Sequence, residues 1–275
     1  GLERAEITRY GYAVEYDFFP PVQLRPTLET KAVEGLFMAG QICGTSGYEE
    51  AAAQGIVAGI NAARKVAGEA EVVIGRDRAY LGVLVDDLVT MSHREPYRMF
   101  SSRAEFRLLL RAGNADRRLA PLGRELGLVD DAAWARFQRK EALLAEARSY
   151  ILQKRIAGAT TLHDLLRRPE VPFAELERLD PELARRALPP EVAEELCVEA
   201  KYAGYIEGQA RQVERVRRLD EKRIPDELDY AAIPGLRREG REKLARVRPA
   251  SLGQAARIAG VTPADIAVLL VHLKR

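Results

Sequence analysis

Apolar residues recur every three to four positions over most of the sequence beyond about residue 76, which is the spacing of one face of an α-helix. The stretch 191–223 carries this pattern furthest. At about 1.5 Å per residue, such a helix would span about 50 Å, so part of it is expected to project beyond one small domain. Helices are predicted at 79–90, 97–111, 117–127, 131–155 and 191–223, with short helices and turns within 157–190.

The beginning of the chain has a different pattern. The short apolar run 36–39 predicts a buried strand, and a glycine-rich loop follows it. A helix is predicted over 48–66, with Ser46 as its N-cap, Glu49 completing a capping box, and Gly68 ending it. Small residues recur along this helix, so it can approach a sheet or a flat ligand closely. They are Ala52, Gly55, Gly59, Ala62 and Ala63.

The loop before this helix is the clearest candidate for chemistry. A helix start rich in glycine exposes backbone N–H groups at the positive end of the helix dipole. Such a place suits an anion, a phosphate or the electron-rich edge of a flavin ring, although an ordinary strand-to-helix turn has the same appearance. The loop lacks the Gly-Lys-Ser/Thr ending of a P-loop, and no G-x-G-x-x-G occurs near the start of the chain.

Composition excludes several classes of protein. The 275 residues are 47% hydrophobic and 31% charged, which argues against a disordered or collagen-like chain. No run of about 18 uncharged apolar residues is present, so no membrane span is predicted. The two cysteines cannot form a disulfide framework, and a cytoplasmic location is expected. Because the sequence starts at Gly1, we expect the C-terminal part of a longer protein.

The formal net charge of +2 conceals an uneven distribution. Residues 91–124 carry eight arginines and three acids, residues 201–275 carry a net charge of +6, and the remainder is acidic. Basic segments in an acidic background indicate a polyanion or an acidic partner. The alternative is that these arginines lie on solvated helix faces.

Three parts of the sequence resemble the MnmG (GidA) family of tRNA uridine 5-carboxymethylaminomethyl modification enzymes. They are 36–63, then 86–90 with 95–111, and finally 233–236 with 252–265. The resemblance spans almost the whole chain. The folate- and FAD-dependent tRNA uridine C5-methyltransferases have a motif similar to the first but lack the arginine-rich second motif. A non-catalytic RNA-binding helical scaffold is a further alternative.

This resemblance implies a mostly α fold in two parts. Residues 1–75 would be the remnant of an α/β FAD-binding, Rossmann-like domain. Residues 76–275 would form an all-α C-terminal domain that binds tRNA and a partner, with a terminal subdomain at about 191–275.

The resemblance also implies an activity. Members of the family use FAD, NADH and the carbon of methylene-tetrahydrofolate, and they work with the GTPase MnmE. They add an aminomethyl or carboxymethylaminomethyl group to C5 of the wobble uridine of certain tRNAs. A homodimer is expected, and the catalytic residues are expected upstream of this sequence, so the chain should be incomplete for catalysis.

By the same resemblance, Gln41 contacts the flavin, and Gly40, Gly44, Thr45 and Tyr48 shape its pocket. Cys43 stands where the family is expected to have Asn. A thiol beside a flavin suggests redox or nucleophilic chemistry, but cysteine also serves as a small buried residue.

The arginine-rich motif is the candidate tRNA surface, because guanidinium groups suit phosphate oxygens. In the predicted helix, Arg103, Arg107 and Arg111 share a face, with Arg98 preceding them and Arg94 flanking the group. Ion pairs with Glu95 and Glu105 are the structural alternative. Two aromatic residues of the motif can stack on bases or pack in the core, namely Tyr97 and Phe106.

Near the C-terminus, 233–236 and 260–266 each precede a predicted helix, and both resemble the turns of helix-hairpin-helix units. Thr262 and Pro263 form a good helix start. The same features would suit a small protein-docking bundle, and the family resemblance implies that this part binds MnmE and tRNA. No metal-ligand spacing is found, and the three histidines are scattered at His93, His163 and His272.

Overall fold

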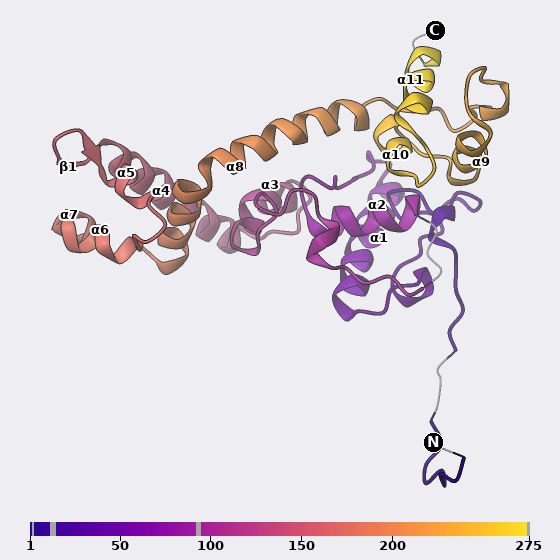
Figure 1. Cartoon of the computed structure of the whole chain (residues 1–275), viewed down its shortest axis with the longest axis horizontal. Helices are drawn as coiled ribbons and strands as arrows, with labels where there is room; N and C mark the ends of the chain where they lie inside the picture. The colour runs from indigo at the N-terminus through magenta and orange to yellow at the C-terminus, as the bar shows by residue number, and fades with distance from the viewer. Residues whose placement is uncertain (2, 12–14, 92–94, 274–275) are drawn as a thin grey trace.

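The computed structural model describes residues 1, 3–11, 15–91 and 95–273, and they form a mostly helical fold, as predicted. Figure 1 shows a long helix, α8, crossing from a lobe of short helices to the group that contains the last three helices. The helices are α1 (Tyr48–Ala67), α2 (Tyr80–Thr90), α3 (Ala115–Glu125), α4 (Asp131–Gln153), α5 (Leu162–Leu166), α6 (Phe173–Leu179), α7 (Pro181–Arg185), α8 (Pro190–Asp220), α9 (Arg238–Val247), α10 (Leu252–Arg257) and α11 (Pro263–His272).

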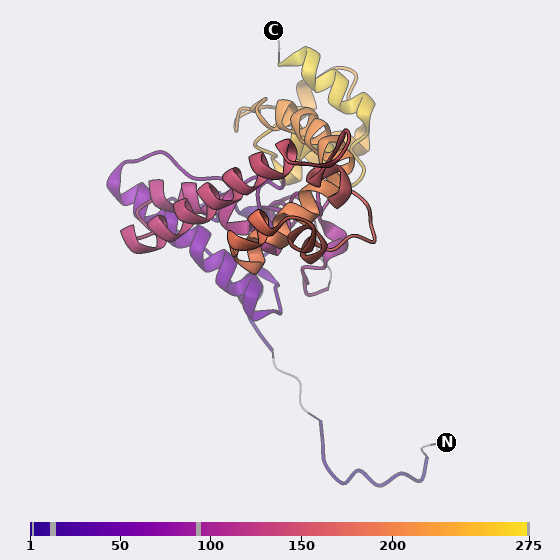
Figure 2. The ribbon, with the colours of Figure 1, turned by 90° about the vertical axis from the view of Figure 1, so that its left-hand side faces the viewer.

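Helices α1 and α2 pack together over an apolar cluster that includes Leu24, Leu28 and Val57. The prediction of a strand at 36–39 is wrong. Phe37 forms only an isolated bridge with Glu29, flanked by one backbone hydrogen bond on each side, from Thr30 N–H to the Leu36 carbonyl and from Met38 N–H to the Leu28 carbonyl. In Figures 1 and 2 the first residues of the chain lead away from this cluster.

The predicted boundaries of the first helix are nearly right, but its predicted cap is wrong. Gly47, not Ser46, is the N-cap residue, and no side chain caps the helix start. The end is confirmed: Gly68 has φ 70°, and its N–H donates to the carbonyl oxygens of Arg64 and Lys65.

The helix predicted over 97–111 does not form, so its arginines do not share a helix face. Only a short 3-10 turn at Ser101–Arg103 is present in this stretch. The N–H of Tyr97 donates to the Gly44 carbonyl at 2.7 Å, and the N–H of Met99 donates to Glu50 Oε1 at 2.9 Å. These long-range bonds take the place of the bonds that a helix would make.

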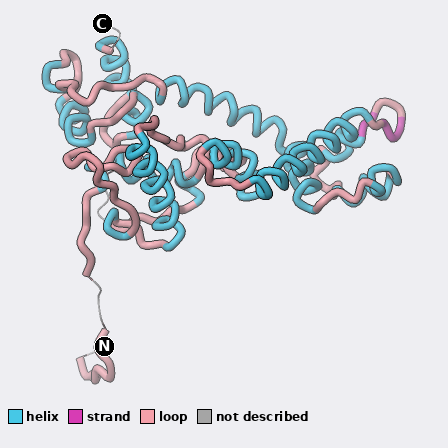
Figure 3. The backbone as a smooth tube through the Cα atoms, turned by 180° about the vertical axis from the view of Figure 1, so that it is seen from behind, coloured by secondary structure: helices cyan, strands magenta, loops and turns pink. Residues whose placement is uncertain are grey.

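Residues 131–200, here called the middle lobe, contain α4 to α7 and the start of α8 around one apolar core. The predicted short helices are confirmed. The expectation of an all-α region is wrong in one place, where β1 (Arg155–Ala157) and β2 (Thr160–Thr161) pair antiparallel at the tip of the lobe in Figure 3. The hairpin forms because the chain turns at Gly158, whose φ is 59°.

The long helix predicted over 191–223 is confirmed as α8. Its first turns bury Val192 and Leu196 in the middle lobe, and Val213 is buried against the segment around Phe106. Between these contacts the helix is largely exposed, as the projecting part was predicted to be.

Residues 224–273, here called the terminal bundle, have an apolar core of their own. The predicted start of α11 is confirmed, since Thr262 and Asp265 form a capping box and Pro263 opens the helix. Within the described part of the chain, no helix combines the length and apolarity needed to cross a bilayer.

Candidate functional site

The loop 40–47, here called the glycine loop, is held in shape by one buried amide. Gln54 Nε2 donates to Thr45 Oγ1 at 2.9 Å, and Gln54 Oε1 accepts from the Gly40 N–H at 3.0 Å. Thr45 Oγ1 in turn donates to the Gly40 carbonyl at 3.1 Å. Sequence reasoning missed Gln54, although a glutamine within a helix of small and apolar residues is a signal for such a role.

Two glycines give the loop its path. Gly40 and Gly44 have φ values of 88° and 80°, which favour glycine over other residues. A Cβ atom on Gly44 would also lie 2.8 Å from the ring of Phe18. The loop geometry therefore requires glycine at Gly44 on two separate grounds.

An open pocket of about 280 Å³ lies beside this loop. Three of the predicted flavin residues, Gln41, Gly44 and Thr45, line it, while Gly40 lies next to Gln41 in the chain. Tyr48 does not line it and is 93% exposed. The structure thus brings together the residues of the loop but not the first residue of α1. The remaining lining residues are Tyr16, Asp17, Phe18, Ser46, Glu95 and Pro96.

A buried carboxylate lies under the start of α1. Glu50 is 5% exposed, and a Cβ atom on Gly47 would fall where its carboxylate lies. This negative charge offsets the positive end of the helix dipole. The helix start is therefore less suited to a phosphate than to an uncharged, electron-rich ring edge.

Cys43 is completely buried beneath the loop. Burial raises the pKa of its thiol to about 11, so the thiol is protonated near neutral pH. A protonated, inaccessible thiol is a poor nucleophile, which favours the interpretation of Cys43 as a small buried residue.

A buried ionic network lies behind the glycine loop and was not predicted. The Arg76 guanidinium contacts Asp87 at 2.5 Å, Asp86 at 3.2 Å and Glu105 at 2.8 Å. Burial alone would lower the pKa of Arg76, but the two aspartates outweigh it and raise the pKa. Tyr97 donates its hydroxyl hydrogen to Asp87 Oδ2 at 2.8 Å, so the network reaches the residue that bonds the glycine loop.

The four predicted tRNA arginines divide into two kinds. Arg111 contacts Glu195 at 2.6 Å, and the Arg103 guanidinium lies 4.5 Å from the centre of the Tyr97 ring. The Arg98 side chain is 53% exposed, although its Nε lies 3.6 Å from Glu50 Oε1. Arg107 is exposed and has no ion pair among the described residues.

Within the described residues, neither of the acids proposed as structural partners pairs with an arginine of the motif. Glu105 pairs with Arg76 instead of an arginine of its own motif, and Glu95 lines the pocket beside the glycine loop. Tyr97 and Phe106 are both buried, so they pack in the core. Arg94 and His93 lie outside the described residues.

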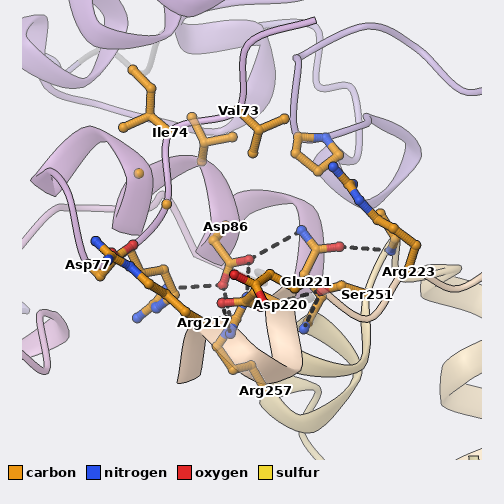
Figure 4. Close-up of a pocket in the computed structure, with 17 residues that line it drawn as sticks. Val73, Ile74, Asp77, Asp86, Arg217, Asp220, Glu221, Arg223, Ser251 and Arg257 are labelled. Atoms are coloured by element: carbon orange, nitrogen blue, oxygen red, sulfur yellow. Dashed lines mark hydrogen bonds and ion pairs between the residues drawn. The ribbon is translucent and has the colours of Figure 1, made fainter. Parts of the chain in front are cut away.

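A second pocket, of about 410 Å³, lies where α2, the end of α8 and α10 meet (Figure 4). Arg257 donates to both oxygens of Asp86, at 2.6 and 2.8 Å, and contacts Asp220 at 3.0 Å. Arg217 pairs with Asp77 at 2.6 Å on the other side. The positive and negative side chains around this pocket largely neutralise one another. We therefore interpret the pocket as part of the packing interface between the terminal bundle and α2.

Among the residues that the structure describes, no three His, Cys, Asp or Glu side chains are grouped closely enough to hold a metal ion. Asp265 is the most deeply buried acid of the terminal bundle, and its oxygens are taken by Thr262 and Arg237. The hydrogen bond from Arg237 is the main reason that the pKa of Asp265 is lowered.

Comparison with known families gives three matches along the chain. The model named glucose inhibited division protein A matches residues 1–70. Two further models describe the C-terminal helical domain and the C-terminal helical bundle of the tRNA modifying enzyme MnmG/GidA, and they match residues 131–210 and 212–275.

Individual proteins give the same result. The tRNA uridine 5-carboxymethylaminomethyl modification enzyme MnmG of Syntrophotalea carbinolica is 53% identical over all of this chain and 47% of its own length. The Geobacter sulfurreducens enzyme of the same name is 50% identical, with 46% of its length covered. A structure of Aquifex aeolicus GidA superposes with a TM-score of 0.82 at 40% identity, covering 94% of this chain and 43% of that one. The chain therefore spans about half the length of the curated relatives that it matches.

Proposed function

Because the chain belongs to the MnmG/GidA family, we propose that it is part of an enzyme that modifies C5 of the wobble uridine of certain tRNAs. The group added would be aminomethyl or carboxymethylaminomethyl, with FAD as cofactor and NADH and methylene-tetrahydrofolate as co-substrates. The enzyme would act in the cytoplasm as a homodimer, together with the GTPase MnmE. The names of the relatives support this proposal, and neither the methyltransferase nor the scaffold alternative has comparable support.

The glycine loop is our proposed contribution of this chain to the flavin pocket. The observation that carries it is a loop with two positive-φ glycines, fixed by buried Gln54, beside an open pocket with Gln41 exposed at its edge. Gly40, Gln41, Gly44 and Thr45 would hold one edge of the flavin ring. When bound, FAD supplies the redox chemistry of the reaction.

The exposed side of α1 supports the proposal of a Rossmann-like remnant. Gly55 and Gly59 lie in an open groove, and a Cβ atom on either would meet nothing within 4 Å. Ile56, which is exposed, lines the same groove. A helix face of small and apolar residues is suited to packing closely on a sheet, as the helices of doubly wound folds do.

For tRNA, we propose that Arg98 and Arg107 contact phosphates. Both are exposed, so their guanidinium groups can reach a ligand, and the contact of Arg98 with Glu50 at 3.6 Å leaves its side chain 53% exposed. Arg103 and Arg111 are engaged within the protein, and we propose that they hold the 97–111 segment in the position that presents the other two.

The flavin assignment is tested by Gln41→Ala in the protein at the full length of its relatives. The variant should lose FAD occupancy, measured from flavin absorbance per mole of protein, because a polar group at the edge of the pocket is removed. Gln23→Ala is the matched control, since Gln23 is also exposed but lies outside this pocket. Equal occupancy in the two variants would count against Gln41, and a colourless wild-type protein would count against the flavin pocket itself.

A further inference from the structure

The C-terminal half of α8 presents three cations on a single face, and a fourth follows the end of the helix. Arg211, Arg215 and Arg218 follow one another at intervals of four and three residues, which keeps them on one side of the helix, and Lys222 comes two residues after the helix ends at Asp220. All four are exposed, and within the described residues none of them forms an ion pair. Buried Val213 points to the opposite side, where the helix packs on the rest of the protein.

Two other arginines of this region form ion pairs. Arg217 lies off this face and contacts Asp77 at 2.6 Å, while Arg257 is held between Asp86 and Asp220. The carboxylates near the end of α8 therefore neutralise the inward-facing cations. The outward-facing charge of the helix is left for solvent or for a ligand.

Two glycines continue the same face toward the N-terminus of the helix. Gly204 and Gly208 lie seven and three residues before Arg211, and a Cβ atom on either would meet nothing within 4 Å. A glycine within a helix costs about 1 kcal/mol relative to alanine. No contact among the described residues explains why both positions lack a side chain, but the close approach of a ligand to the helix would.

We propose that the outer face of α8, made of Gly204, Gly208, Arg211, Arg215 and Arg218 together with Lys222 just beyond the end of the helix, binds the phosphate backbone of tRNA. The proposal rests on the proposed function for the identity of the nucleic acid. The glycines let the backbone approach the helix axis, and the guanidinium forks match phosphate oxygens. In Figure 1 no element covers the upper side of α8 over its second half.

The composition of this face favours RNA over an acidic protein. The cores of protein interfaces are enriched in aromatic residues and methionine, whereas the outer face consists of glycines and cations with one exposed aromatic residue, Tyr205, beside it. From Gly204 to Arg218 it spans about 21 Å along the helix axis, at about 1.5 Å per residue, which is long enough to follow several phosphates. Two acids, Glu207 and Glu214, lie at its edges, and Glu214 contacts Arg217 at 3.5 Å.

The test is the salt dependence of tRNA affinity in the protein at the full length of its relatives. The variant R211Q/R215Q/R218Q/K222Q should bind tRNA about 10- to 100-fold more weakly, and the slope of log K against log salt should fall by about 3. The control R136Q/R139Q/R167Q/R168Q removes four exposed charges from the middle lobe and should keep the wild-type slope.

A second variant tests the close approach separately. Gly204→Leu with Gly208→Leu should strengthen the helix, since leucine is a good helix former, and yet weaken tRNA binding by blocking the approach. Unchanged tRNA affinity in this variant would overturn the role of the glycines.

Three outcomes of the test with the four-charge variant would overturn the proposal. Equal slopes in the four-charge variant and the wild type, or an equal loss in the control, would overturn the proposal. Loss of binding to an acidic protein with tRNA affinity intact would overturn it in favour of a protein partner. Flavin occupancy is measured in the same preparations, so failure of the flavin assignment is seen independently of failure of this surface.

Discussion

The segment 97–111 and the outer face of α8 are both rich in arginine, but they use it in opposite ways. In the segment, Arg103 lies over a buried tyrosine ring and Arg111 is bound to a buried glutamate. On the outer face of α8, all the cations lack carboxylate partners among the described residues. The density of arginine in a sequence therefore does not identify a polyanion site by itself.

The difference arises from what packs on each region. The 97–111 segment crosses buried carboxylates on α2 and α8, and these capture the nearest guanidinium groups. The cations on the outer face of α8 are exposed, so they stay hydrated. Four substitutions test this contrast.

Arg76→Ala should give the largest effect. Arg76 is the buried cation that neutralises Asp86 and Asp87, and its removal leaves two buried carboxylates with less compensation. Stability in urea should fall by about 3–5 kcal/mol. A loss below about 1 kcal/mol would contradict the claim that the inner arginines hold the fold.

Arg111→Ala should give the next largest loss of stability. Glu195 keeps a contact from Arg117 at 3.2 Å, so the expected loss of stability is smaller, about 1–3 kcal/mol. The salt slope for tRNA binding should stay at the wild-type value, because Arg111 is not free to reach a phosphate. A reduced slope in folded protein would show that its pairing with Glu195 opens to admit RNA.

Lys31 is a buried cation whose hydrogen-bond partners are neutral carbonyl groups, so its titration reports the effect of burial. Its Nζ donates to the carbonyl oxygens of Val22 and Val247, at 2.8 and 2.6 Å, and burial lowers its pKa to about 8. The unfolded chain therefore holds more protons than the folded protein between about pH 8 and 10.5, so stability should rise with pH over this range.

Lys31→Met should remove that rise, which we expect to be on the order of 1–2 kcal/mol. Urea unfolding of both proteins at pH 8 and pH 10 measures it, and the difference between them cancels other groups that titrate there. Parallel pH dependence in the two proteins would contradict the assignment.

Arg107→Gln should give the smallest effect on stability, below about 0.5 kcal/mol, because the side chain is exposed. The tRNA salt slope should nevertheless fall by about 0.7–0.9. Arg185→Gln, at an exposed arginine of the middle lobe, is the matched control and should keep the slope. If the two variants behave alike, Arg107 does not contact tRNA.

The sequence predicted the long helices well because their apolar period is sustained and their ends carry local signals. Gly68 ends α1 as expected, and Thr262 begins α11. The helix predicted over 97–111 failed because its apolar residues are buried in separate clusters. There Tyr97 bonds to the glycine loop and Leu110 packs with Val213.

Parts of the candidate site could not be predicted from the local sequence. The loop Gly40–Thr45 was found from its glycines and its resemblance to a known motif, whereas the role of Gln54 depends on which side of α1 faces the loop. Whether an arginine is paired depends on carboxylates far away in the chain, as with Arg111 and Glu195. Such pairings become visible only when the fold brings the partners together.

The most direct test of the contrast is chemical modification of arginine by phenylglyoxal, with and without tRNA, followed by mass spectrometry. The outer arginines of α8, Arg211, Arg215 and Arg218, should react readily in the free protein and be protected by tRNA. Arg76 and Arg111 should react slowly in both samples because they are buried in ion pairs. Rapid reaction of Arg111, or no protection of the α8 arginines in protein that binds tRNA, would contradict the account.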